Sequence, residues 1–140
     1  MSEWTFRDYL RAVGGNGKMT FENEILEWTL GLPKKAQAKM DMMILSLQSS
    51  AIWPPQYVSA LKGCPQIFEL RVSSFGVEYR PLGCHGPKRR EFTLLKGAIE
   101  KGGKLEPPSA CETASERRKQ VFEGWPTCEH EFTRSNSRKA

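Results

Sequence analysis

Two short alternating segments, 67–72 and 77–80, constrain the fold of this chain more than any other feature. Apolar and polar residues take turns along both, and a period of two is the pattern of a strand with one buried face. The alternating apolar residues are Phe68, Leu70, Val72, Val77 and Tyr79. The sequence Ser-Ser-Phe-Gly at 73–76 lies between the segments and suits a turn. The pattern therefore predicts an antiparallel hairpin over 67–80.

A four-residue loop at 73–76 fixes the register of this hairpin. Val72 then faces Val77, and Leu70 faces Tyr79, on the core side. On the other side, Arg71 faces Glu78 and Glu69 faces Arg80. Opposite charges directly across a ladder stabilise each other. Each arginine therefore has a carboxylate neighbour that competes with any phosphate ligand.

The segments before the hairpin predict one strand and two helices. Alternation over 4–10 indicates a short strand, and the glycines of 13–17 indicate a turn or flexible loop. Thr20 is suited to cap a helix that ends at Leu30, and Pro33 begins a second helix that runs through Leu47. Residues 57–64 are expected to be irregular.

The segments after the hairpin predict a third strand and a third helix. A turn is expected at 83–87, a strand at 91–96 and a glycine- and lysine-bearing loop at 97–108. Ser109 and Glu112 have the spacing of a capping box for a helix that ends before Gly124. The expected fold is α+β, with the order β-α-α-β-β-β-α. The two N-terminal helices cover one face of an antiparallel meander sheet, and the other face carries the basic residues.

The composition and ends of the chain indicate one cytoplasmic domain. Its 140 residues suit a single domain, predicted here as 1–124 with a polar, mobile tail at 125–140. No apolar run approaches the roughly 20 residues that cross a bilayer, and the N-terminus lacks the pattern of a signal peptide. Four cysteines in a reducing compartment are expected to be free thiols. The pairs Cys84-His85 and Cys128-x-His130 lack the spacing of a zinc finger, so no metal is expected.

The positive charge of the chain is concentrated in one segment. Residues 62–104 contain nine lysines and arginines against four acidic residues, whereas the segments before and after it are balanced. A localised excess of this kind is typical of a polyanion-binding surface. A merely solvated surface more often scatters its excess charge. The sequence therefore indicates a nucleic-acid partner.

Several motifs, in this order and spacing, resemble the RelE/ParE toxin superfamily, and in particular its HigB-like, phage-derived branch. They are Leu61-Lys62-Gly63, Phe68-Glu69-Leu70-Arg71-Val72, Tyr79-Arg80, Leu94-Leu95-Lys96-Gly97, the run 99–108, and a helix with Ala114 and Arg117-Arg118. The resemblance covers 19–122. It implies a ribosome-dependent endoribonuclease that cuts mRNA without a metal or cofactor and is restrained by a helix-turn-helix antitoxin. The chain departs from the pattern at Ala98 and Glu100, and no tyrosine follows Tyr79.

Metal-free cleavage through the 2′-OH needs a proton acceptor, cations around the phosphate and an acid for the leaving oxygen. Arginine binds phosphate through parallel hydrogen bonds and stays protonated. The catalytic candidates are Arg80, Arg71, Lys101, Lys104, Glu69 and His130; Glu69 is a possible base, and His130 a substitute for the missing late tyrosine. His85 is the other residue that titrates near neutrality. The candidates for binding RNA phosphates are Lys62, Lys88, Arg89, Arg90, Lys96, Arg117 and Arg118.

Two other functions remain open at this point. The missing tyrosine favours an RNA- or ribosome-binding regulator that keeps the fold without cleavage. A ParE-like inhibitor of DNA gyrase would act through protein contacts, and the cations expected on the sheet argue against it.

Overall fold

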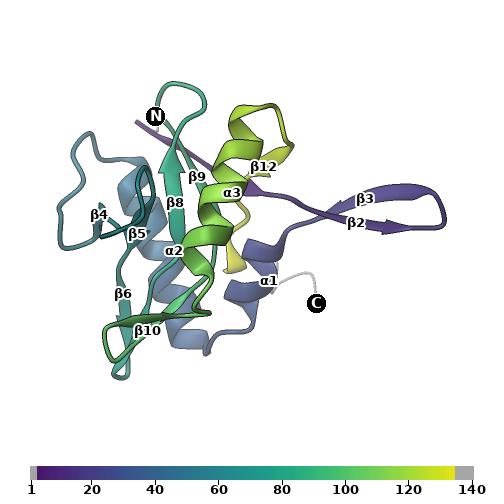
Figure 1. The fold of residues 1–140 in the computed structure, drawn as a ribbon. Helices are drawn as coiled ribbons and strands as arrows, with labels where there is room; N and C mark the ends of the chain where they lie inside the picture. The colour runs from purple at the N-terminus through teal and green to yellow at the C-terminus, as the bar shows by residue number, and fades with distance from the viewer. Residues whose placement is uncertain (1–2, 135–140) are drawn as a thin grey trace.

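The structure is a computed structural model that describes residues 3–134, and it places a central sheet between two helical layers (Figure 1). Helices α1 (Glu24–Leu30) and α2 (Lys34–Gln48) pack on one face of the sheet, and α3 (Ala110–Phe122) packs on the other. No helix in the described range is long and apolar enough to cross a membrane.

The central sheet has six strands in the order β12-β1-β9-β8-β5-β4. They are β1 (Thr5–Tyr9), β4 (Val58–Ala60), β5 (Phe68–Leu70), β8 (Leu82–His85), β9 (Glu91–Lys96) and β12 (Thr127–Glu129). Strand β1 runs parallel to β9, and the other neighbours are antiparallel. The predicted α+β class is therefore confirmed, but the large sheet is mixed rather than an antiparallel meander.

Six further strands form two smaller sheets. Strands β6 (Val72–Ser74), β7 (Val77–Tyr79), β10 (Ile99–Lys101) and β11 (Lys104–Glu106) form a sheet in the order β11-β10-β7-β6. Strands β2 (Arg11–Gly15) and β3 (Lys18–Glu22) form a separate hairpin. Residues 13–17, predicted to be a turn or flexible loop, contain the turn of the β2–β3 hairpin. Residues 97–108, predicted to be a loop, largely form the β10–β11 hairpin.

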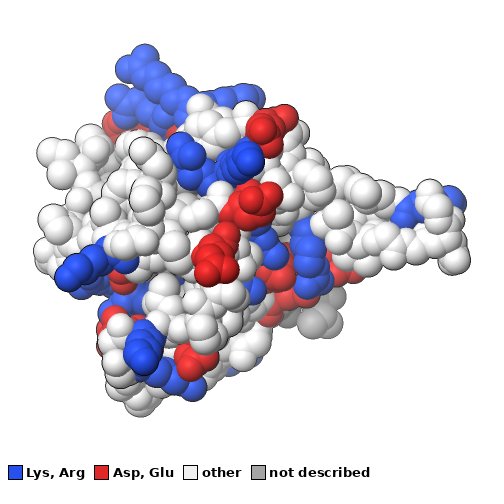
Figure 2. Space-filling model, viewed as in Figure 1, with Lys and Arg blue, Asp and Glu red and all other residues white. Residues whose placement is uncertain are grey.

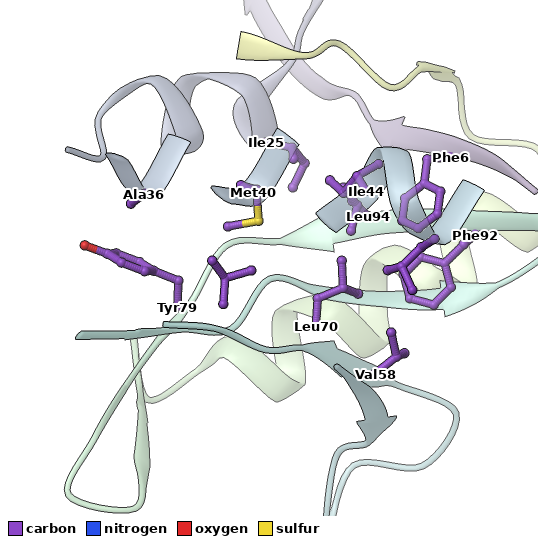
Figure 3. Packing of buried hydrophobic residues seen from close by; sticks show 12 residues of the cluster. Phe6, Ile25, Ala36, Met40, Ile44, Val58, Leu70, Tyr79, Phe92 and Leu94 are labelled. Carbon is purple, nitrogen blue, oxygen red and sulfur yellow. The ribbon is translucent and has the colours of Figure 1, made fainter. Parts of the chain in front are cut away.

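Two apolar clusters lie on opposite faces of β9. Phe92 and Leu94 face α2, where they pack with Met40 and Ile44 in a layer that Figure 3 shows from close by. Leu95 points to the other face and packs against α3. Alternation along one strand thus supplies both cores. The prediction that the second face holds the basic residues is wrong, because α3 covers it.

Only the end of the hairpin predicted at 67–80 forms, between β6 and β7, and its register differs from the prediction. Residues 68–70 belong to β5, which pairs with β4 and β8 in the central sheet, so the predicted pairs Leu70–Tyr79 and Glu69–Arg80 do not form. Val72 pairs with Tyr79 and Ser73 with Glu78, so the turn has two residues, Phe75 and Gly76, with φ of 50° and 76°. Two successive residues with positive φ form a two-residue hairpin turn, whose backbone twist matches the twist of the two strands. Because the register differs by two positions and not one, each residue keeps its predicted face.

The start predicted for α3 is confirmed, whereas the start predicted for α1 is wrong. Asn23 caps α1 by accepting a hydrogen bond from the Leu26 amide, whereas Thr20 lies inside β3. Ser109 precedes α3 but its side chain makes no capping hydrogen bond, so the predicted capping box does not form. Asn23 and Thr20 have similar capping chemistry. Because Thr20 pairs with Val13 within the β2–β3 hairpin, the helix begins only after Asn23.

The predicted tail after Gly124 packs on the body of the protein as far as Arg134, and part of it, β12, joins the central sheet. Strand β12 pairs antiparallel with β1, and His130 and Thr133 are buried. The Thr133 amide and hydroxyl both donate to the carboxylate of Asp41 on α2. Polar side chains of this segment thus have buried partners on β1 and α2, whereas the sequence predicted a tail separate from the domain. Its remaining part, 135–140, lies outside the described residues.

The expectation of four free thiols is also wrong. Cys64 and Cys111 form a disulfide, which joins the loop before β5 to α3 across a Cα–Cα distance of 5.9 Å. Cys84 and Cys128 are free. Burial raises the pKa of the Cys84 thiol to about 11, so this thiol is inert at neutral pH.

Candidate nucleic-acid interface

Arg80, the first choice for a phosphate-binding cation, is buried among three carboxylates. Its Nη2 donates to Glu78 Oε1 at 2.8 Å and lies 3.7 Å from Glu100 Oε1. Its Nε lies 2.9 Å from Glu69 Oε1 without the alignment of a hydrogen bond. The side chain is only 6% exposed. Glu100, a departure from the family pattern, thus contributes to neutralising Arg80, and little positive charge is left for RNA.

Arg71 lies nearby and is much freer. Its side chain is 45% exposed, and the one ion pair that it makes within residues 3–134 is long, 3.7 Å from Nε to Glu69 Oε1. A groove of about 640 Å³ runs beside it. The groove is lined by Lys39, Met42, Met43, Gln56, Tyr57, Arg71, Val72, Ser73, Glu78 and Arg80. Tyr57, which directly precedes β4, is half-exposed there, and the segment around it has no alternating pattern that would predict this position.

The acidic side chains of this groove are weak candidates for a general base. Hydrogen bonds from the Ser73 hydroxyl, at 2.6 Å, and from Arg80 hold the pKa of Glu78 below its usual range. A carboxylate stabilised in this way takes up a proton poorly at neutral pH. Glu69 is buried between Arg71 and Arg80, so its negative charge serves the two arginines.

Lys101 and Lys104 lie on the β10–β11 hairpin and not in a loop over Arg80. They pair directly across the ladder, and both are exposed. Neither side chain makes an ion pair or hydrogen bond within residues 3–134. Two like charges opposite each other repel, and an anion between them relieves that repulsion. They form a small basic rim on the sheet β11-β10-β7-β6, whose strands β6 and β7 line the groove beside Arg71.

His130, one of the catalytic candidates, is buried and lies outside the groove beside Arg71. Its Nδ1 lies 2.7 Å from Oδ1 of Asp8, a fully buried carboxylate on β1. The segment after Gly124 does fold back, but onto β1, and His130 does not line the groove beside Arg71. The structure therefore places it in the core, where it supplies Asp8 with a polar partner.

Two of the candidates for RNA binding are committed to α1. Arg117 donates to Glu24 Oε2 at 2.6 Å and to the Leu95 carbonyl, and its guanidinium stacks over the Tyr9 ring. Lys96 lies 3.5 Å from the same Glu24 carboxylate. Burial would raise the pKa of Glu24, but the hydrogen bond from Arg117 and the neighbouring cations bring it below its usual value. Both cations are therefore structural.

A second hollow, here named the turn hollow, gathers the other basic candidates. It has a volume of about 450 Å³ and lies at the connection from β8 to β9. Its lining is Trp4, His85, Gly86, Pro87, Lys88, Arg89, Arg90, Glu91 and Phe122. Arg118 of α3 stacks over Phe122 at 4.4 Å from guanidinium carbon to ring centre. Figure 2 shows Lys and Arg atoms gathered over this turn at the top of the view.

The turn hollow combines free cations with aromatic surface. The side chains of Lys88 and Arg89 make no ion pair within the described chain, whereas Arg90 is paired with Glu3 at 2.7 Å. His85 packs against four aromatic rings, those of Trp4, Trp53, Phe68 and Phe92. Burial lowers the pKa of His85, so it is neutral at pH 7.

The predicted site thus divides into three places. The structure brings Arg80, Arg71 and Glu69 together, puts Lys101 and Lys104 on a rim, and collects Lys88, Arg89, Arg90 and Arg118 at the turn hollow. Lys62 is exposed in the loop before β5, and no ion pair or hydrogen bond holds its side chain within residues 3–134. No group of three or more metal-ligating side chains occurs in the part of the chain that is described.

Comparison of the chain with family models, with characterised proteins and with solved structures finds no match.

Proposed function

We propose that this chain is an RNA-binding protein of the RelE/ParE toxin type, HigB-like branch, that acts on mRNA at the ribosome and is restrained by a helix-turn-helix antitoxin. The order of the main elements supports this. The hairpins β2–β3, β6–β7 and β10–β11 and the last strand, β12, are set aside for this comparison. The remaining elements follow in the order β1-α1-α2-β4-β5-β8-β9-α3. Apart from β4, this is the order β-α-α-β-β-β-α that the resemblance implies.

The observation that carries the proposal is the set of uncommitted cations beside aromatic rings in the turn hollow. Lys88 and Arg89 have no carboxylate partner in the described range, and Trp4 and Phe122 lie within the same hollow. Free lysines and arginines bind backbone phosphates, and aromatic faces stack on unpaired bases. Lys101 and Lys104 add a second pair of free cations, on the β10–β11 hairpin.

Binding without cleavage is the form of this function that the geometry supports best. A transition state of phosphate cleavage needs cations that are free to follow its developing charge. Arg80 is occupied by Glu69, Glu78 and Glu100, and the lowered pKa of Glu78 makes that carboxylate a poor base.

A metal-free mRNA endoribonuclease is the second candidate, and the groove beside Arg71 favours it. Arg71 is exposed enough to bind a phosphate, and Tyr57 offers a phenol near it, in place of the tyrosine that is missing after Tyr79. In this candidate Arg80 is a positioning residue that fixes Glu69 and Glu78.

RNA binding is tested by titrating single-stranded RNA at several salt concentrations. For single strands, each phosphate contact contributes about 0.7 to the slope of log affinity against log salt. We expect Lys88→Ala/Arg89→Ala to weaken binding and to lower the slope by about 1.4. Lys34→Ala/Lys35→Ala removes the same charge from α2 and is expected to leave the slope unchanged. Equal effects of the two double variants would contradict a specific turn-hollow site.

Cleavage is tested by inducing the chain in a bacterial host and mapping mRNA 5′ ends. New ends in translated mRNA that disappear with Arg71→Ala would establish the endoribonuclease. Ribosome binding without new ends would establish the regulator. Inhibition of DNA gyrase in vitro, without RNA binding, would overturn both and favour a ParE-like inhibitor.

A further inference from the structure

The β2–β3 hairpin forms an arm that projects from the body of the protein (Figure 1). Its two strands pair only with each other, and every residue of β3 is exposed. A lone two-stranded hairpin is marginally stable in water. It also offers unpaired backbone groups along both outer edges, which are templates for another strand.

The arm has one apolar face and few free charges. Alternation places Ala12, Gly14, Met19 and Phe21 on the same face, with Met19 64% and Phe21 42% exposed. Arg11, at the base, is paired with Glu22, Glu24 and Glu27. The arm is mainly white in Figure 2, so its surface fits a protein partner better than a nucleic acid.

The turn of the arm determines which backbone groups are free. Asn16 and Gly17, with φ of 53° and 74°, make a two-residue turn closed by the pair Gly15–Lys18. Such a closing pair exchanges hydrogen bonds, and bonded pairs alternate along an antiparallel ladder. The Thr20 backbone groups therefore face Val13 on β2. Those of Met19 and Phe21 point outward from the free edge of β3.

We propose that the β3 edges of two copies of this chain pair antiparallel about a two-fold axis at Thr20. In this register Met19 faces Phe21 of the second copy, which is the pair whose backbone groups are free on both sides. Lys18 then faces Glu22 of the second copy, and Thr20 faces Thr20. Hydrogen bonding, apolar contact and charge are complementary in the same register, as a symmetric interface requires. The result is a four-stranded sheet with one continuous apolar face.

The first test measures the molar mass of the purified full chain by light scattering coupled to size exclusion. We expect twice the chain mass of 15.9 kDa. Lys18→Glu places two carboxylates opposite each other at both ends of the interface, so we expect the monomer. The double variant Lys18→Glu/Glu22→Gln removes this repulsion and is expected to restore the dimer, because Arg11 keeps Glu24 and Glu27 as partners. A monomeric wild type at about 100 µM, well above the micromolar range of weak specific association, would overturn the proposal.

The second test identifies the edge that pairs. Thiols introduced by Thr20→Cys are opposite each other at a non-hydrogen-bonded position, where Cα atoms are about 4.5 Å apart and within the range that a disulfide spans. With glutathione disulfide as the oxidant, we expect a covalent dimer on a non-reducing gel. Wild type, which retains Cys84 and Cys128, is the control and is expected to remain monomeric on the gel. A covalent dimer with Val13→Cys and none with Thr20→Cys would assign the contact to the β2 edge and refute the register.

Discussion

Replacing Arg80 by methionine tests whether this arginine is structural or is held ready for a phosphate. Methionine keeps much of the side-chain volume and removes the charge. Glu69 would then remain buried, 9% exposed, without its closest cation at 2.9 Å. Removing one partner of a buried ion pair costs about 3–5 kcal/mol, because the other charge is left in a medium of low polarity. Glu78 and Glu100 are exposed by more than a third, so solvent screens them and they add little.

We therefore expect Arg80→Met to lower the free energy of unfolding by about 3–5 kcal/mol, measured by urea titration with tryptophan fluorescence. Arg71→Met is the matched control, because that side chain is 45% exposed, and it is expected to cost about 0.5 kcal/mol or less. Adding Glu69→Gln to Arg80→Met should recover part of the loss, because the buried charge is then gone.

A cost below about 1 kcal/mol for Arg80→Met, the range of an exposed ion pair, would refute this reasoning. It would mean that the carboxylates around Arg80 are already solvated or protonated. If the same variant also abolished cleavage of mRNA while the fold stayed intact, the nuclease, with Arg80 as its positioning residue, would become the better proposal.

Three further predictions follow from single contacts. The pKa of Glu24 is lower in the folded protein than in the unfolded chain. Its contribution to stability is therefore complete above the unfolded-state pKa and is lost as the pH falls through the folded-state pKa. Glu24→Gln should accordingly reduce the fall in unfolding free energy at acidic pH. Gly83→Ala should destabilise by about 1–3 kcal/mol in urea titrations, since a Cβ there would lie 2.4 Å from the Phe92 ring, and a neutral result would contradict the β8–β9 packing. A chain ending at Gly124 should melt at a lower temperature than the full chain, because it loses β12 and leaves the buried Asp8 without His130; equal melting temperatures would restore the idea of a dispensable tail.

The sequence predicted the elements whose signal is local and repeated. The apolar face of α2, the strand 91–96 and the helix before Gly124 follow from periodicity, and the structure has all three. Alternation also placed Leu70, Val72 and Tyr79 on the buried side, although the register was wrong by two positions. The charge segment 62–104 was visible in the distribution of charged residues. The predicted hairpin register gave Glu69 as the carboxylate neighbour of Arg80, and the two are in contact although they do not pair across a ladder.

Other features were decided by contacts between residues that are distant in the sequence. Whether a basic side chain is free depends on acids elsewhere: Arg117 and Lys96 meet Glu24, about 70 to 90 positions away, whereas Lys88 and Arg89 meet none in the described range. The polar segment after Gly124 joins the sheet because β1 offers an edge and a buried carboxylate. Periodicity reports which face of an element is buried, but it carries no information on what covers that face. The sequence by itself therefore determined the elements with a periodic pattern and the sign of the surface charge, and the tertiary structure decided which of these charges remain without a carboxylate partner.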